Sequence, residues 1–140
     1  MQSYRLVLAL TNNGMAAVAE IVTFANVKGG SGKSTLCVNI ASMLAKLNRS
    51  VCVIDADPQQ STLDWIKNTN DPVLSLVDCN DVDILGEVSQ RGYDFVLIDT
   101  QGSLNKELAG FLKISSLILV PCRISRDDIV GQGWIQMFLN

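Results

Sequence analysis

The chain has 140 residues, 48% of them hydrophobic, and this length and composition suit a single domain with a buried core. A formal net charge of -3 and a sequence pI of about 4.7 argue against a protein whose whole surface binds nucleic acid. The chain has no histidine and its four cysteines form no C-x-x-C pair. This pattern argues against a zinc site and a histidine-dependent nucleophilic triad, and it favours buried free thiols.

Signals for a membrane or for secretion are weak. No apolar run approaches the length that spans a bilayer, and the run over residues 6–10 is too short for a secretory signal. We therefore expect a cytoplasmic protein without a membrane partner.

The first part of the chain carries no clear hydrophobic period. We divide the chain into residues 1–20, an N-terminal extension of uncertain structure, and one domain over residues 21–140. The alternative for the extension is an additional edge strand over residues 5–10.

A glycine-rich loop follows the buried, β-branched strand predicted over residues 21–26. Its residues are Lys28, Gly29, Gly30, Ser31, Gly32, Lys33, Ser34 and Thr35. The glycines let backbone N–H groups turn inward, and the helix predicted over residues 33–48 adds its positive end, so the loop can enclose a phosphate chain. In the P-loop pattern Lys33 reaches the terminal phosphates and Ser34 offers its hydroxyl to Mg²⁺. The alternative, a glycine-rich surface turn, is disfavoured because strand, loop and helix follow in the required order.

Two carboxylates follow the next buried strand, which is predicted over residues 51–54. The strand ends in the segment D-A-D-P-Q, which contains Asp55 and Asp57. Ligands of open α/β sheets bind at the carboxyl ends of the strands, so both carboxylates are placed to act on a bound nucleotide. The alternative interpretation makes Asp57 and Pro58 a turn and Asp55 a helix cap.

Another buried strand, predicted over residues 93–100, ends in a third carboxylate. Four apolar residues lead into Asp99, which is typical of a Walker B strand whose carboxylate binds Mg²⁺ beside the phosphate loop. An aspartate at the end of a strand is common. Asp99 is therefore informative because it follows the phosphate loop and the D-A-D-P-Q segment in the expected order.

The remaining segments are expected to build the sheet and its covering layers. We predict helices over residues 61–68, 81–90, 105–113 and 127–139, and strands over residues 73–77 and 117–121. Trp65 is expected in the core rather than as a stacking platform. Apolar residues recur at helical spacing over residues 33–48 and predict this helix. They are Leu36, Ile40, Met43, Leu44 and Leu47.

Strands that alternate with helices predict a three-layer α/β fold of the P-loop NTPase type, with a mostly parallel central sheet and right-handed crossovers. The three motif-bearing loops then lie at one edge of the sheet. Their convergence predicts Mg²⁺-dependent binding and slow hydrolysis of ATP.

The phosphate loop departs from the general pattern in an informative way. Val27 stands where the first glycine would fall, and a second lysine stands at Lys28. The loop resembles the deviant Walker A loop, K-G-G-x-G-K-[ST], of the ParA/MinD family of partition and positioning ATPases. The resemblance implies that Lys28 crosses the interface of a nucleotide-sandwich homodimer and contacts the partner's phosphates. Taken alone, Lys28 would be read as a solvated loop lysine.

The D-x-D-P-Q segment resembles the ParA form of this family's switch. The resemblance implies that Asp57 orients or activates the attacking water and that Asp55 supports the Mg²⁺ region. The catalytic residues that it implies are Lys28, Lys33 and Asp57. The nucleotide-binding residues are Lys28, Gly29, Gly30, Ser31, Gly32, Lys33, Ser34 and Thr35, and the metal-binding residues are Ser34, Asp55 and Asp99.

The resemblance favours a ParA-type partition ATPase over MinD. It implies an ATP-bound homodimer that binds DNA non-specifically, associates with the nucleoid, and moves plasmid or chromosome cargo with a centromere-binding, ParB-type partner. After Asp99 and Thr100 the family usually continues with two prolines or Pro-Gly, whereas Gln101 and Gly102 follow here. Relatives continue beyond the last residues of this sequence, so we expect the fold to be incomplete at its C-terminus.

Two alternatives to an active partition ATPase stay open. One is a truncated, non-hydrolysing module that binds nucleotide or interferes with dimers. The other is a P-loop small-molecule kinase, which Lys28 and the D-x-D-P-Q segment disfavour.

Overall fold

The computed structural model describes residues 4–10, 19–69, 74–78, 88 and 91–123. Its elements are β1 (Tyr4–Leu10), β2 (Glu20–Phe24), α1 (Lys33–Lys46), β3 (Val51–Ala56), α2 (Ser61–Thr69), β4 (Leu74–Asp78), β5 (Phe95–Thr100), α4 (Lys106–Ile114) and β6 (Leu117–Arg123). Where predicted elements fall on described residues, their ends differ from these by no more than two residues. Of the helix predicted over residues 81–90 only Val88 is described, and it is helical, while the helix predicted over residues 127–139 lies outside the described residues.

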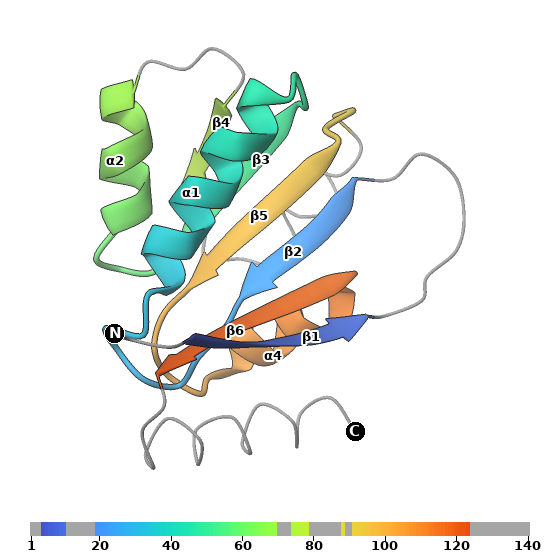
Figure 1. Ribbon diagram of the computed structural model, residues 1–140. Helices are drawn as coiled ribbons and strands as arrows, with labels where there is room; N and C mark the ends of the chain where they lie inside the picture. The colour runs from blue at the N-terminus through green and yellow to red at the C-terminus, as the bar shows by residue number, and fades with distance from the viewer. Residues whose placement is uncertain (1–3, 11–18, 70–73, 79–87, 89–90, 124–140) are drawn as a thin grey trace.

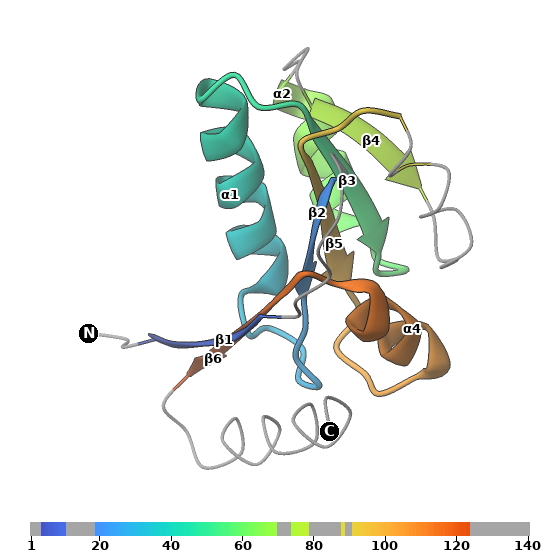
Figure 2. The same ribbon diagram turned by 90° about the vertical axis from the view of Figure 1, so that its right-hand side faces the viewer.

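A six-stranded sheet in the order β1-β6-β2-β5-β3-β4 forms the centre of the described molecule (Figure 1). Neighbouring strands from β6 to β4 run parallel, whereas β1 runs antiparallel to β6 at the edge. Helices α1 and α2 cover one face and α4 covers the other (Figure 2). The predicted three-layer, mostly parallel α/β fold is confirmed, and residues 5–10 form the edge strand that was the alternative for the N-terminal segment.

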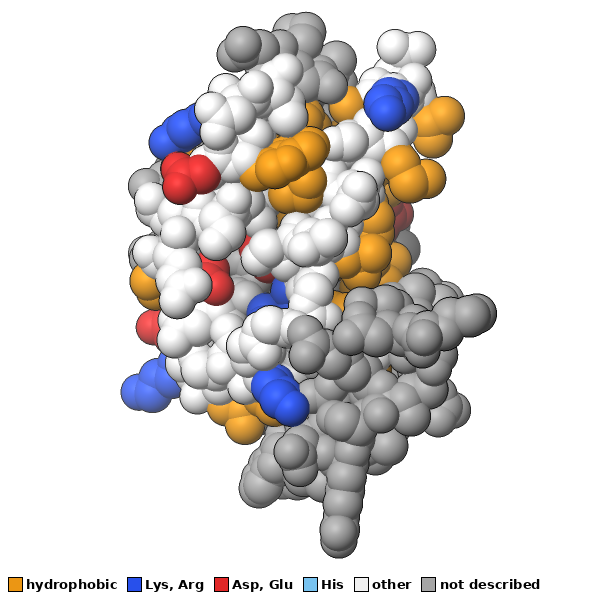
Figure 3. Space-filling view, turned by 60° about the vertical axis from the view of Figure 1, so that its left-hand side comes forward, with side chains coloured by type: hydrophobic (Ala, Val, Ile, Leu, Met, Phe, Trp, Pro, Cys, Tyr) orange, Lys and Arg blue, Asp and Glu red, His pale blue; other side chains and the backbone are white. Residues whose placement is uncertain are grey.

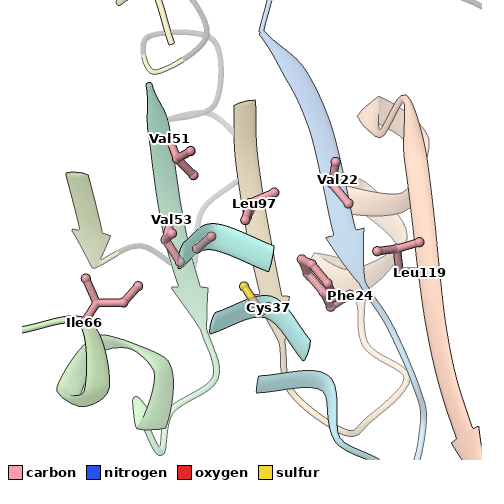
Figure 4. Close-up of a cluster of buried hydrophobic side chains, with 9 residues drawn as sticks. Val22, Phe24, Cys37, Val51, Val53, Ile66, Leu97 and Leu119 are labelled. Atoms are coloured by element: carbon pink, nitrogen blue, oxygen red, sulfur yellow. The ribbon is translucent and has the colours of Figure 1, made fainter. Parts of the chain in front are cut away.

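Alternate residues of the central strands enter two different cores. Val51, Val53 and Leu97 point to the face under α1, where they form one core with Cys37 (Figure 4). Their neighbours Cys52 and Ile98 enter the core of the opposite face. Strands buried on both faces read as continuous apolar runs, which is why the sequence predicted them well.

The small residues of helix α1 are more deeply buried than the large apolar residues whose spacing predicted the helix. The residues that it buries in the apolar core are mostly small: Cys37, Val38, Ala41 and Ala45. Leu36, Ile40 and Leu44 pack only partly buried against this core, while Met43 is 63% exposed and Leu47 is 68% exposed. Small side chains let a helix lie close to a sheet, so the spacing of the large residues was a poor guide to the buried face.

The expectation that Trp65 lies in the core is wrong. Its side chain is 43% exposed. Helix α2 buries Thr62, Leu63 and Ile66, and Trp65 falls beside this stripe of the helix. The prediction of buried thiols outside any disulfide is confirmed for Cys37, Cys52 and Cys122, while Cys79 lies outside the described residues.

A polar clamp joins the chain just before β3 to the chain just before β5. The Asp94 carboxylate oxygen Oδ2 accepts hydrogen bonds from the backbone N–H of Ser50 (2.8 Å) and from the Ser50 hydroxyl (3.1 Å). The backbone N–H of Asp94 donates in return to the carbonyl of Ser50 (3.0 Å). These bonds to Ser50, helped by Arg49, hold the pKa of Asp94 below its usual value of 3.8.

We expect Asp94→Asn to lower the free energy of unfolding at neutral pH, because the neutral amide lacks the negative charge that the hydrogen bonds from Ser50 stabilise. A carboxyl whose folded-state pKa is depressed stabilises the fold above the unfolded pKa, and this stabilisation is lost as the pH falls through the folded pKa. Urea unfolding at pH 7 and at about pH 3 measures the difference. The difference between the two proteins should be smaller at the acidic pH, and a difference of constant size would contradict a role for the ionised carboxylate.

Candidate functional site

The phosphate loop, residues 27–32, connects β2 to α1 and needs glycine at two positions. Gly30 and Gly32 have φ angles of 69° and 93°, in the left-handed region that favours glycine. Gly32 is also the N-cap of α1, and its carbonyl accepts the hydrogen bond from the N–H of Leu36 (2.9 Å). The loop thus presents its backbone and the positive end of α1 to the same space.

Two contacts fix the start of this loop. The fully buried side chain of Asn26 donates from Nδ2 to the carbonyl of Pro121 in β6 (2.7 Å), and its Oδ1 accepts from the N–H of Lys28 (3.0 Å). Gly102, after β5, lies directly against the peptide that joins Lys28 to Gly29. A Cβ atom at Gly102 would lie 2.9 Å from the backbone nitrogen of Gly29, so close an approach that only glycine fits without a shift.

Lys33 begins α1 with its side chain almost wholly buried, at 6% exposure. Its ammonium donates to the carbonyl of Lys28 (3.2 Å). Burial lowers the pKa of Lys33, while the nearby carboxylates of Asp99 and Asp57 oppose that shift. The buried hydroxyl of Ser31 has no hydrogen-bond partner in the described part of the chain. A phosphate group would supply the negative charge and the hydrogen-bonding oxygens that this pocket lacks.

Asp55 and Asp99 stand opposite each other at the carboxyl ends of β3 and β5. Asp99 is fully buried, and burial raises its pKa, while the nearby hydroxyls of Ser34 and Thr62 oppose the shift. Its Oδ2 accepts a hydrogen bond of 2.6 Å from the hydroxyl of Thr62. Its Oδ1 has no partner among the residues that the structure describes.

Asp55 uses its carboxylate to cap α2. Its Oδ2 accepts from the N–H of Leu63 (2.9 Å) and its Oδ1 from the N–H of Asp57 (3.1 Å). Burial raises the pKa of Asp55, and these backbone bonds oppose the shift. This is the capping geometry that the alternative interpretation of the D-x-D-P-Q segment describes.

Asp57 lies in the turn between β3 and α2. Its Oδ1 accepts from the N–H of Gln59 (2.9 Å), and its carbonyl accepts from the N–H of Gln60 (2.9 Å). The residue is half-buried and lines the cavity at the phosphate loop. Asp57 therefore makes a turn and also faces the space where a nucleotide would lie.

The cavity at this edge of the sheet has a volume of about 1170 Å³. Residues 29–36 line it together with Asp57, Pro58, Gln59, Ser61, Gln101 and Gly102. The predicted residues from Gly29 to Thr35 and Asp57 therefore meet in one space. Lys28, which is exposed, and the buried Asp55 and Asp99 are not part of its lining.

The oxygen atoms of Ser34 and Asp99 fit a Mg²⁺ ion better than a transition metal. Within residues 4–10, 19–69, 74–78, 88 and 91–123, no three His, Cys, Asp or Glu side chains gather as a metal cluster. Mg²⁺ needs only one or two protein carboxylates when phosphates and water supply the other ligands. The buried, unpartnered Oδ1 of Asp99 is the atom that such an ion would satisfy.

Sequence reasoning missed Thr62, whose hydroxyl reaches Asp99 across 37 positions of the chain, and the role of Asn26. Both depend on strands that are neighbours only in the folded sheet, so no local pattern signals them. The Lys and Arg side chains on the face drawn in Figure 3 are scattered rather than gathered into a basic patch. No helix in the described ranges has the length and apolar character needed to cross a membrane.

Known proteins with similar sequences include VirC1 of Rhizobium radiobacter, 27% identical over 119 residues, which cover 79% of this chain and 52% of VirC1. ParA of the same organism is 29% identical over 122 residues, covering 84% of this chain and 55% of ParA. The maintenance of carboxysome distribution protein A of Halothiobacillus neapolitanus is 35% identical over 118 residues, which cover 79% of this chain and 54% of that protein. This chain spans about half the length of these curated relatives.

Solved structures show the same fold. A Borrelia burgdorferi B31 protein described as a plasmid partition protein, bound to AMPPNP, superposes with a TM-score of 0.70 at 22% identity and covers 87% of this chain and 70% of that one. The ParA protein of pNOB8, bound to nonspecific DNA, gives a TM-score of 0.68 at 21% identity, and the superposition covers 88% of this chain and 59% of that one.

The family model described as the CobQ/CobB/MinD/ParA nucleotide binding domain matches residues 22–120, well over half of the chain. That match includes the phosphate loop, both segments with carboxylates and the strands that carry them. The chain therefore belongs to the CobQ/CobB/MinD/ParA family of nucleotide-binding proteins.

Proposed function

We propose that this chain carries the Mg²⁺-dependent ATPase site of a ParA-type partition protein that works as a nucleotide-sandwich homodimer. The observation that supports this most is the meeting of the phosphate loop, buried Lys33 and Asp57 around one cavity. The family match and the AMPPNP-bound relative of the same fold add to it.

In this proposal the phosphate loop binds the nucleotide through its backbone. N–H groups of residues 29–35 donate to the phosphate oxygens, and the N-terminal end of α1 adds its positive potential. The Lys33 ammonium exchanges the carbonyl of Lys28 for the terminal phosphates, which are the stronger acceptors. The burial that lowers the pKa of Lys33 also excludes water, so its charge acts with little screening.

Ser34 and Asp99 are the residues that would hold Mg²⁺. The bound ion would neutralise the charge that develops on the transferring phosphoryl group. Asp55 supports this region as the cap of α2, because backbone N–H groups occupy both of its carboxylate oxygens.

Hydrolysis is assigned to Asp57. Its Oδ1 is held by the N–H of Gln59, so the carboxylate is fixed in the turn that lines the cavity, where it orients the attacking water. Lys28 of a second copy would add its ammonium to the phosphates in trans, as a cation that stabilises the transition state. Lys28 is exposed, as an interface residue of the monomer must be.

The cellular role proposed here is plasmid or chromosome partition. It includes nonspecific DNA as a ligand of the ATP-bound dimer, in line with the DNA-bound ParA of pNOB8, and a centromere-binding, ParB-type partner that stimulates hydrolysis. Nucleoid association follows from the DNA contact.

We expect Lys33→Ala to weaken binding of a fluorescent ATP analogue in Mg²⁺ by roughly tenfold to a hundredfold, since a charge-assisted bond to phosphate is lost. Lys46→Ala is the matched control, because Lys46 is an exposed lysine of the last turn of the same helix. Equal affinities of the two variants would contradict the proposed site.

Asp57→Asn should reduce ATP hydrolysis by roughly a hundredfold or more while nucleotide affinity is retained. The asparagine keeps the side-chain oxygen that accepts from Gln59, so the turn survives and only the charge is lost. Phosphate release under DNA and partner stimulation measures the effect, with Asp64→Asn on the exposed side of α2 as the control. Nucleotide binding by the unaltered chain without any turnover would instead indicate a binding module, and transfer to an added acceptor would indicate a kinase.

Lys28→Ala should reduce ATP-dependent dimerisation, and lower hydrolysis by roughly tenfold or more, with little change in nucleotide affinity of the monomer. Alanine keeps the backbone carbonyl to which Lys33 donates, so the loop itself is preserved. Sedimentation velocity with a non-hydrolysable ATP analogue measures the dimer. A dimer of undiminished stability together with normal turnover would exclude the role in trans.

A further inference from the structure

The hydroxyl of Thr62 makes a contact that none of the sequence motifs predicts. Thr62 is the second residue of α2 and is fully buried, with 0% exposure. Its Oγ1 lies 2.6 Å from Oδ2 of Asp99, at the end of β5. We propose that Thr62 is a positioning residue, which fixes one oxygen of the Asp99 carboxylate so that the other is held ready for Mg²⁺ beside Ser34. This inference rests on the proposed function of the site.

The short distance identifies a strong hydrogen bond with a defined direction. An O–H···O⁻ bond of 2.5–2.7 Å is typical of a hydroxyl that donates to a carboxylate. A hydroxyl has one proton, and here it is given to Asp99. Because both partners are buried, water does not compete for this bond.

The carboxylate of Asp99 is asymmetric as a result. Oδ2 is occupied by Thr62, whereas Oδ1 is buried without a hydrogen-bond partner among the described residues. A carboxylate held at one oxygen cannot rotate freely about its bond to Cβ, so the direction of the second oxygen is fixed as well. Outer groups that orient a metal ligand in this way typically change metal affinity by about tenfold to a hundredfold when removed.

The same bond connects the metal carboxylate to the turn that carries Asp57. Asp55 accepts from the N–H groups of both Asp57 and Leu63, so the turn and the first turn of α2 are held by one side chain. Thr62 lies between these two contacts and extends the network to Asp99. A displacement of the Asp57 turn would therefore be passed to the metal site through Thr62.

Titration of MgCl₂ against the full chain at a fixed concentration of a fluorescent ATP analogue tests this proposal. Thr62→Val removes the hydroxyl and keeps the shape, and Thr62→Ser keeps the hydroxyl. Thr69→Val is the matched control, because Thr69 lies on the same helix and donates its hydroxyl to the carbonyl of Ile66 instead. We expect the Mg²⁺ midpoint to rise roughly tenfold or more in the valine variant and to stay unchanged in the other two. Nucleotide binding in EDTA should be the same for all four proteins.

Three outcomes overturn the inference. A normal Mg²⁺ midpoint in Thr62→Val would show that Thr62 does not position Asp99. Nucleotide binding by Thr62→Val that weakens equally with and without Mg²⁺ would show a merely structural role. A lower thermal unfolding temperature of that variant would identify this case. Thr62→Ala replaces the valine variant in every arm if the latter does not fold. Failure of the unaltered chain to bind nucleotide in response to Mg²⁺ would refute the proposed function itself, together with this inference.

Discussion

Two buried carboxylates on neighbouring parallel strands are the constraint around which the site is built. The register of β3 and β5 places Asp55 opposite Asp99, and burial raises the pKa of both. Charges in such a setting persist only when they are paired or hydrogen-bonded. Asp55 meets this need with backbone N–H groups of α2, and Asp99 meets it with Thr62 and the nearby Lys33.

This constraint explains why α2 begins where it does. Its first N–H groups are donors without partners inside the helix, and Asp55 is an acceptor without a partner in the sheet. The Asp55 carboxylate accepts from an N–H group of the first turn of α2, so donor and acceptor satisfy each other. The turn that contains Asp57 is the short connection between β3 and this first turn. The position of Asp57 at the cavity is therefore a consequence of capping as much as of the turn sequence. Capping and switching are compatible roles for one segment.

The sequence was sufficient for features that depend on local chemistry. Buried parallel strands read as apolar runs, and the glycines of the phosphate loop stand where φ is positive, at Gly30 and Gly32. Contacts between distant segments could not be predicted from the sequence. The bond from Thr62 to Asp99, the bond from Asn26 to Pro121 and the approach of Gly102 to Gly29 each require the strand order to be known first. The buried face of α1 was not evident from the sequence for another reason, because alanine and cysteine carry little hydrophobic signal although they pack closely against a sheet.

The antiparallel pairing of β1 has a consequence for the edge of the molecule. Tyr4–Leu10 pairs with β6 along its whole length, from Leu117 to Arg123, so the outer hydrogen-bonding groups of β6 are already engaged. One edge of a strand accepts one neighbour. Any other strand that pairs with this edge of β6, such as one from a second molecule, must first displace β1. A new neighbour at this edge therefore has to compete with Tyr4–Leu10, which already pairs with β6.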